Sequence, residues 1–303
     1  MSVIALVLAM AGEVVLSFAS GKEVKTEKWV PETLIPSPSY TVKKNGSYTF
    51  PEDTVSYSIS LTDLNTGHWQ KTDASSCLAE YLKNNFPFFV QKKKADINIS
   101  INVFSSRLPD ESYTINIGNA GIKISAGSET GAFYALQTLT QMTSGWKDRT
   151  VPCCEITDGP RFPYRGLHFD VSRHFRSKEF LMKQMDAMAL LKLNRMHLHL
   201  TDGAGWRIEI KEYPRLTEYA AWRPQKKWTD WVEAGAGNCE FDQPGAYGGY
   251  YTAEDIREIL EYARERHIEV IPEIEMPGHS EEVIRAYPEL GCTGGPYEVW
   301  RQW

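Results

Sequence analysis

Short runs in which apolar and polar residues alternate mark the first half of the chain. Two of them, Asp-Ile-Asn-Ile-Ser-Ile at residues 96–101 and Ser-Tyr-Thr-Ile-Asn-Ile at residues 112–117, repeat every two residues. That is the period of a strand with one buried and one solvated face. Residues 75–84 and 130–143 carry helical spacing instead, and Gly145 ends the second pattern. The patterns predict an α+β domain over residues 30–150 that ends near Thr150.

After a linking segment at residues 151–163, the pattern changes to alternating strands and helices. Strands are predicted at residues 166–171, 195–201 and 268–274, and we expect them to be buried on both faces. The helix after Ser177 has a predicted buried stripe of Leu181, Met185, Met188 and Leu191, and the helix at Thr252 opens on a capping-box sequence and has a stripe of Ile256, Ile259, Leu260 and Ala263. This alternation predicts a parallel sheet within residues 159–303.

A segment of about fifty residues, rich in Gly and Trp, separates the second predicted strand from the helix at Thr252. This is long for a connection between a strand and a helix, so the segment is a candidate functional loop. Its tryptophans, Trp222, Trp228 and Trp231, fit either packing inside the loop or a platform for a sugar ring.

The carboxyl ends of the three predicted strands are rich in polar side chains, and ligands of parallel α/β folds bind at this end. The first strand ends in Asp-Val-Ser-Arg-His (170–174), the second in His-Leu-Thr-Asp (199–202) and the third in Glu-Ile-Glu-Met-Pro-Gly-His (273–279). An arginine donates forked hydrogen bonds while carboxylates accept from hydroxyls, so this set suits a polyhydroxylated ligand.

These polar residues also have structural interpretations. Arg173 fits an ion pair at the rim of the sheet, and Glu275 and His279 flank a Pro-Gly turn that they fit as caps. His197 and His199 share one strand face, where bonding to neighbouring carboxylates in the core is favoured over metal ligation. Spacing alone therefore predicts a polar ligand site and leaves each residue's role open.

Composition narrows the function class. With 33 basic and 39 acidic residues the net charge is −6, which argues against a nucleic-acid or anionic-membrane partner. Five cysteines are too few for a disulfide scaffold, and no Cys/His cluster has zinc-ligand spacing, so we expect no structural metal. Residues 1–20 have the apolar run and small-residue end of a signal peptide, and no stretch is long enough to span a bilayer. We expect a secreted or periplasmic protein.

Three ordered motifs together resemble glycoside hydrolase family 20, the β-N-acetylhexosaminidases. They are Arg-Gly-Leu-His-Phe-Asp-Val-Ser-Arg-His-Phe at 165–175, His-Leu-His-Leu-Thr-Asp at 197–202 followed by Gly-Trp-Arg at 205–207, and Pro-Glu-Ile-Glu-Met-Pro-Gly-His at 272–279. Residues 131–139 resemble the closing helix of the α+β domain that precedes this family's (β/α)₈ TIM barrel. The resemblance implies retaining exo-cleavage of terminal β-linked GlcNAc or GalNAc, in which the substrate's acetamido oxygen replaces an enzyme nucleophile, with no cofactor.

The resemblance also implies roles for individual residues. Arg173 takes the position that binds the sugar hydroxyls in this family. The polar group that supports the family's catalytic acid is matched by Asp202, Glu275 and His279. Gly203 departs from the family pattern, which often has a second Asp there.

The family's catalytic Asp-Glu pair has no match in the sequence after His279. The pairs Asp110-Glu111, Glu254-Asp255 and Glu281-Glu282 fall in a turn or at helix starts and do not substitute for it. A full barrel takes about 250 residues, whereas about three βα units are recognisable here. We therefore expect an N-terminal portion of the enzyme, inactive by itself, with the catalytic pair located after Trp303.

Two other functions fit the same residues. A metal-dependent TIM-barrel hydrolase would use His197 and His199 as ligands, together with further ligands on later strands. A non-catalytic carbohydrate-binding remnant would keep Arg173 and Asp202 but lack the acid.

Overall fold

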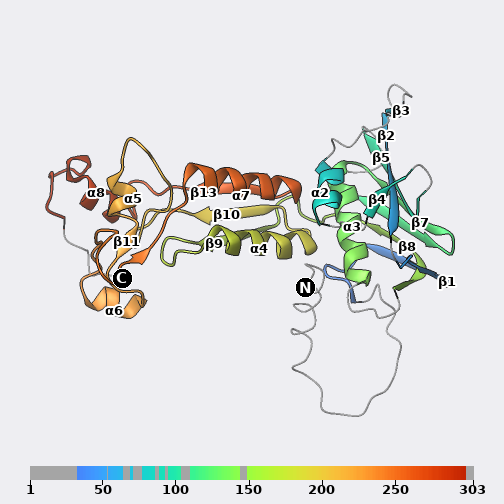
Figure 1. The fold of residues 1–303 in the computed structure, drawn as a ribbon, viewed down its shortest axis with the longest axis horizontal. Coiled ribbons are helices and arrows are strands. Elements are labelled where there is room, and N and C mark those ends of the chain that lie inside the picture. Colours follow the sequence, from blue (N-terminus) through green and yellow to red (C-terminus); the bar gives the residue numbers. More distant parts are fainter. Residues whose placement is uncertain are drawn as a thin grey trace, which may run out of the picture. The chain divides into compact units, whose positions relative to one another are not determined.

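A computed structural model describes residues 33–52, 54–63, 69–70, 77–85, 89–92, 95–103, 110–143 and 149–297 (Figure 1). The chain divides into two compact units. Unit 1 comprises Met1–Pro163, Ala187–Lys192 and Glu265–His267, and unit 2 comprises Tyr164–Asp186, Leu193–Arg264 and Ile268–Trp303. The predicted signal peptide at residues 1–20 lies outside the described residues.

The described part of unit 1 is built on a mixed sheet of eight strands. Along the sheet the order is β1-β8-β6-β7-β5-β2-β3, with β4 beside β2. The strands are β1 (Tyr40–Thr49), β2 (Val55–Asp63), β3 (Trp69–Gln70), β4 (Phe89–Gln91), β5 (Ile97–Val103), β6 (Tyr113–Gly118), β7 (Gly121–Ala126) and β8 (Thr150–Asp158). The alternating runs of the sequence are β5 and β6, and the odd-numbered residues of β6 are buried while the even-numbered ones are partly exposed.

Two helices, α2 (Cys77–Asn85) and α3 (Glu129–Thr143), supply the other half of the unit 1 core (Figure 1). Ten residues of α3 are buried, so this helix has hardly any solvated face. The rings of Tyr81 in α2 and Phe133 in α3 lie edge to face, with centroids 4.8 Å apart. The predicted α+β architecture of this unit is confirmed.

The strand β8 corrects the predicted boundary near Thr150. The first part of the segment predicted to link the domains belongs to this strand, which pairs with β1 between Thr150 and Thr157 and with β6 from Cys154 to Asp158. Pro152 had suggested a link, because proline has no N–H to give to a sheet. Pro152 lies opposite Ser47 of β1, before the pairing with β6 begins. The missing N–H therefore costs the sheet little hydrogen bonding, and the sheet includes the residues up to Asp158.

In unit 2 the described strands form a parallel sheet in the order β13-β10-β9, as predicted. These are β9 (Gly166–Asp170), β10 (Arg195–His199) and β13 (Glu269–Glu273), and they alternate with the helices α4 (Lys178–Leu190) and α7 (Ala253–Glu265) (Figure 1). The capping box of α7 is present, since the N–H of Asp255 donates to Thr252 Oγ1 and the N–H of Thr252 donates to Asp255 Oδ2.

Burial in unit 2 is less complete than the sequence predicts. Only the central strand β10 is deeply buried, with Met196 at 0% and Leu198 at 1% exposure, whereas Leu167 of β9 is 42% exposed. The reason is topological, because β9 and β13 each pair with one neighbour among the described strands, whereas β10 pairs with two. Two leucines predicted to lie in buried stripes, Leu191 and Leu260, are also exposed. Leu191 follows the end of α4, and Leu260 lies next to the buried Ile259 but on the outer side of α7.

The long loop after β10 folds into short elements, namely α5 (Arg215–Glu218), β11 (Trp222–Arg223), α6 (Trp228–Glu233) and β12 (Tyr247–Gly248). Two of its tryptophans pack inside it, because the indole N–H groups of Trp222 and Trp231 donate to the carbonyls of Thr217 and Gly237. After β13 come α8 (Glu281–Ala286) and a 3₁₀ helix (Pro288–Leu290). Among the described residues, no helix combines the length and apolarity needed to cross a membrane.

Candidate functional site

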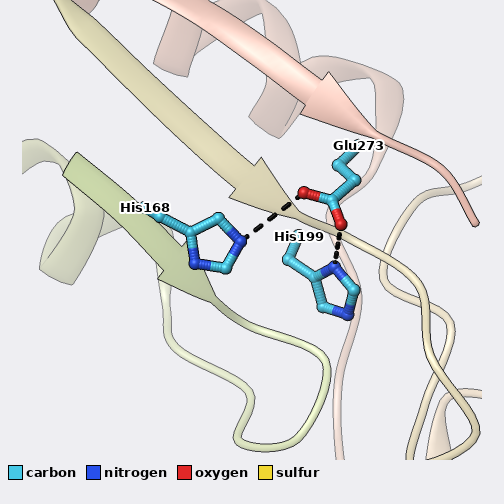
Figure 2. A group of neighbouring side chains, drawn as sticks. All are labelled: His168, His199 and Glu273. Carbon is cyan, nitrogen blue, oxygen red and sulfur yellow. Dashed lines mark hydrogen bonds and ion pairs between the residues drawn. The ribbon is translucent and has the colours of Figure 1, made fainter. Parts of the chain in front are cut away.

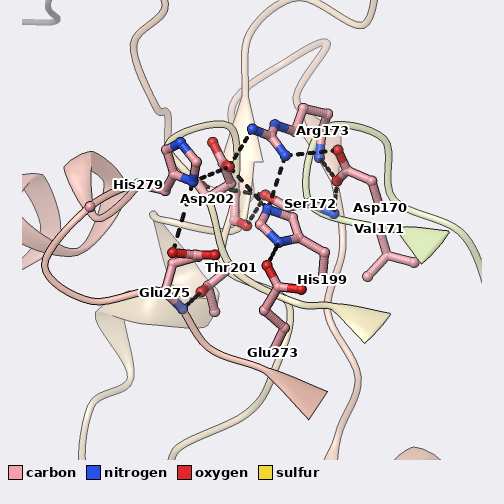
Figure 3. A network of polar contacts seen from close by, with 12 residues as sticks. Asp170, Val171, Ser172, Arg173, His199, Thr201, Asp202, Glu273, Glu275 and His279 are labelled. Carbon is pink, nitrogen blue, oxygen red and sulfur yellow. Dashed lines mark hydrogen bonds and ion pairs between the residues drawn. The ribbon is translucent and has the colours of Figure 1, made fainter. Parts of the chain in front are cut away.

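The carboxyl ends of β9, β10 and β13 meet in one polar network, centred on Asp202 in the loop after β10 (Figure 3). The Asp202 side chain is 4% exposed. Its Oδ2 atom lies 2.6 Å from Arg173 Nη2, 3.0 Å from His199 Nε2 and 3.2 Å from His279 Nδ1. One carboxylate oxygen therefore links side chains from all three strand ends.

Arg173 is held on its other side by Asp170, the last residue of β9. The guanidinium Nη1 atom lies 3.0 Å from Asp170 Oδ2, while the N–H groups of Ser172 and Arg173 donate to Asp170 Oδ1. The Arg173 side chain stays 28% exposed. The ion pairs expected at a rim are thus present, and they fix the guanidinium in a place that solvent still reaches.

Glu273, at the end of β13, contacts the histidines on one face of the sheet, and Figure 2 shows two of them, His168 and His199. Its Oε1 atom accepts a hydrogen bond of 2.6 Å from His199 Nδ1, while its Oε2 atom contacts His197 and lies 3.5 Å from His168 Nε2. Burial raises the pKa of Glu273, but hydrogen bonds such as that from His199 outweigh burial and bring the pKa to about 2. His197 and His199 therefore bond to a neighbouring carboxylate, as the core interpretation predicts.

The ionisation of His199 follows from the same contacts. Burial alone would lower its pKa, but its hydrogen bonds with Asp202 and Glu273 raise the pKa above the ordinary value. The imidazole is therefore stabilised in its charged form between two carboxylates.

Glu275 and His279 lie on the turn that follows β13. The N–H of Glu275 donates to Thr201 Oγ1 at 2.8 Å, which ties this turn to the end of β10. His279 Nδ1 lies 4.0 Å from Glu275 Oε2, and its side chain is 41% exposed. The structure thus brings all four predicted site residues together in the order Arg173, Asp202, His279 and Glu275.

Two groups of side chains in the described residues are close enough to hold a metal ion. One is His168, His199 and Glu273, and the other is His199, Asp202 and His279. The guanidinium of Arg173 already lies 3.0 Å from His199 Nε2 and 2.6 Å from Asp202 Oδ2. A cation bound there would face this positive charge at close range. The donors therefore fit a hydrogen-bonded network better than a divalent-metal site.

Arg207 holds the backbone that leads into Arg173, a role that the sequence did not reveal. The guanidinium is fully buried and donates only to backbone carbonyls, those of Val171, Ser172, Ala204, Ala221 and Gly249. Burial lowers its pKa to about 10, so it stays charged at neutral pH. Because Val171 and Ser172 immediately precede Arg173, these bonds fix the backbone that carries Arg173.

Comparisons with known proteins give the family. The sequence model of the glycosyl hydrolase family 20 catalytic domain matches residues 162–303, and the model of domain 2 of the same family matches residues 32–159. The chain belongs to glycosyl hydrolase family 20. Its parallel sheet is accordingly part of the (β/α)₈ catalytic domain, and its relatives are glycoside hydrolases.

Named relatives and solved structures are similar to much of this chain. A β-hexosaminidase of Porphyromonas gingivalis is 43% identical over 193 residues, covering 61% of this chain and 23% of that protein. A β-hexosaminidase of Vibrio furnissii is 34% identical over 266 residues, covering 85% and 39%. A crystal structure of the exo-β-N-acetylglucosaminidase of Vibrio harveyi with N-acetylglucosamine has a TM-score of 0.71 at 31% identity, covering 89% and 40%. The chain thus spans less than half the length of these relatives.

Proposed function

We propose that this family 20 chain belongs to a retaining exo-β-N-acetylhexosaminidase that removes terminal β-linked GlcNAc or GalNAc from glycans. The observation that carries the proposal is the network of Arg173, Asp202 and His279 at the carboxyl ends of three parallel strands. Relatives named β-hexosaminidase and N,N'-diacetylchitobiase support the substrate class.

In the proposed reaction, the acetamido oxygen of the substrate attacks the anomeric carbon while an acid protonates the departing oxygen. Water then opens the resulting oxazolinium ring with overall retention. Arg173 is suited to donate two hydrogen bonds to ring hydroxyls, because its guanidinium is partly exposed and already oriented by Asp170 and Asp202. The bridge between Asp202 and His279 is suited to control the proton of the acid.

The proposal assigns no acid to these 303 residues, because no Asp-Glu pair follows an apolar strand beyond β13. Glycan binding without turnover is therefore the second candidate function of the chain, favoured by the complete Arg173 and Asp202 pairing.

Hydrolysis and binding assays separate the two candidates. We expect a longer polypeptide that continues through the remaining barrel strands to hydrolyse p-nitrophenyl β-GlcNAc and to release the β-anomer first, as observed by NMR. We expect residues 21–303 to bind GlcNAc without turnover. Failure of the longer protein on both GlcNAc and GalNAc glycosides, or first release of the α-anomer, would overturn the proposal.

We also propose that the protein acts outside the cytoplasm, on the strength of the signal-like residues 1–20. N-terminal sequencing of the protein from a secreting host tests this. An amino terminus near Gly21 is expected, and retention of Met1 in the cytoplasmic fraction would contradict it.

A further inference from the structure

A buried acidic side chain lies next to the network and has no role in the proposed reaction. Glu282, in the first turn of α8, is 0% exposed. Neither of its carboxylate oxygens has a hydrogen-bond partner among the described residues. An ionised carboxylate in such a position loses its hydration without compensation, which is strongly unfavourable.

The start of α8 packs closely on the loop that carries Asp202. A Cβ atom on Gly203 would lie 2.8 Å from Glu281 Oε2, so the absence of a side chain at position 203 makes room for this carboxylate. The departure from the family pattern at Gly203 thus coincides with acidic residues approaching from α8.

Two acidic and two basic side chains surround Glu282, and none of these four bonds to its carboxylate oxygens. Asp202 and Glu281 are acidic and disfavour its ionisation. Arg207, on the loop after β10, gives its donors to backbone carbonyls. Arg285 of α8 donates to Ala236 O and Asn238 Oδ1. Burial in the first place, together with these acidic neighbours, raises the pKa of Glu282 to about 8, although its own backbone N–H and the charge of Arg285 act in the opposite direction.

We propose that Glu282 is a positioning residue of the sugar-binding rim: it remains a neutral carboxylic acid, so that Asp202 alone carries the negative charge that Arg173 and His279 share. The inference rests on the proposed function for its ligand. Loss of the proton from Glu282 would add a second buried negative charge beside Asp202, which would compete with it for Arg173 and His279. Sugar binding then weakens as Glu282 ionises.

The test measures the affinity for GlcNAc by calorimetry at pH 6.5 and pH 9 in three proteins. Wild type is expected to weaken about fivefold or more between the two pH values, since about 1 kcal/mol of charge interaction corresponds to that change. Glu282→Gln keeps the shape but cannot ionise, so its change with pH should be less than about twofold. Glu281→Gln, the matched control on the neighbouring and partly exposed residue, keeps Glu282 ionisable and should still weaken between pH 6.5 and pH 9, with the change shifted to lower pH because one acidic neighbour is removed. Equal pH dependence in wild type and Glu282→Gln would overturn the proposal.

A second readout does not need the sugar. The ring resonances of His279, which contacts Asp202, should show an inflection between pH 7 and 9 in wild type and, shifted to lower pH, in Glu281→Gln, but not in Glu282→Gln. If no protein binds GlcNAc while this inflection is present, the proposed function fails and the neutral state of Glu282 stands. If the inflection is absent from wild type, the inference about Glu282 fails.

Discussion

Replacing Arg207 by Lys tests whether the backbone that carries Arg173 depends on the buried guanidinium of Arg207. Arg207 donates to the carbonyls of Val171, Ser172, Ala204, Ala221 and Gly249. A lysine ammonium has three donors, so at least two of these five carbonyls lose their partner. At roughly 1–3 kcal/mol for each buried group left unpaired, the expected loss is about 2–6 kcal/mol. That is a large part of the 5–15 kcal/mol that stabilises a typical domain.

Urea unfolding followed by tryptophan fluorescence measures this loss. The control is Arg215→Lys, because Arg215 and Glu240 form an ion pair at the surface with side chains 38% and 48% exposed. The control should cost less than about 1 kcal/mol, as exposed ion pairs do. A loss below about 1 kcal/mol for Arg207→Lys would refute the reasoning, because it would mean that the five carbonyls are satisfied without the guanidinium.

Three further outcomes are expected. Arg173→Ala should weaken GlcNAc binding about tenfold or more with little change in melting temperature, since it leaves sugar hydroxyls unpaired at roughly 1.5–3 kcal/mol; the opposite result would make Arg173 purely structural. Asp202→Asn and His279→Ala should each displace the same limb of the pH-rate profile of the longer enzyme, and their effects should not add; additive losses without displacement would indicate packing. The melting temperature of Glu282→Gln should exceed that of wild type by an amount that grows from about pH 5 to pH 8. The pKa of Glu282 is raised to about 8 when folded, so the unfolded chain releases this proton first and wild-type stability falls over that range. Parallel melting curves at all pH values would contradict this.

Most of the fold could be predicted from the sequence because its signals are local. The alternation in β5 and β6 is a property of a few neighbouring residues, and so is the capping box of Thr252 and Asp255. β8 was missed because Pro152 is compatible with a strand only where a second neighbour is absent, and this depends on pairing with the distant β1. Exposure of Leu167 likewise depends on which strand forms the edge of the sheet.

The site residues likewise differ in how far the sequence could predict them. The four residues Arg173, Asp202, Glu275 and His279 could be predicted to converge, because parallel strands present their carboxyl ends at the same edge. The roles of Arg207 and Glu282 could not, because each depends on what covers the side chain. An arginine in a polar loop and a glutamate in the first turn of a helix are usually solvated, whereas here both are 0% exposed.

Three strands assemble the network because of their register. His199 of the central strand β10 lies opposite Asp170 of β9 and Glu273 of β13, so Arg173 and Asp202, just after the strand ends, meet at 2.6 Å. The contacts that orient Arg173 in the described part of the chain therefore come from the ends of β9 and β10 and from the loop after β10. The proposed catalysis has a further requirement, since an acid must reach the departing oxygen and the acetamido group must be held. In the proposed reaction, affinity for the sugar and turnover thus depend on different parts of the barrel, and we expect substitutions at Arg173 to affect the first even where the second is absent.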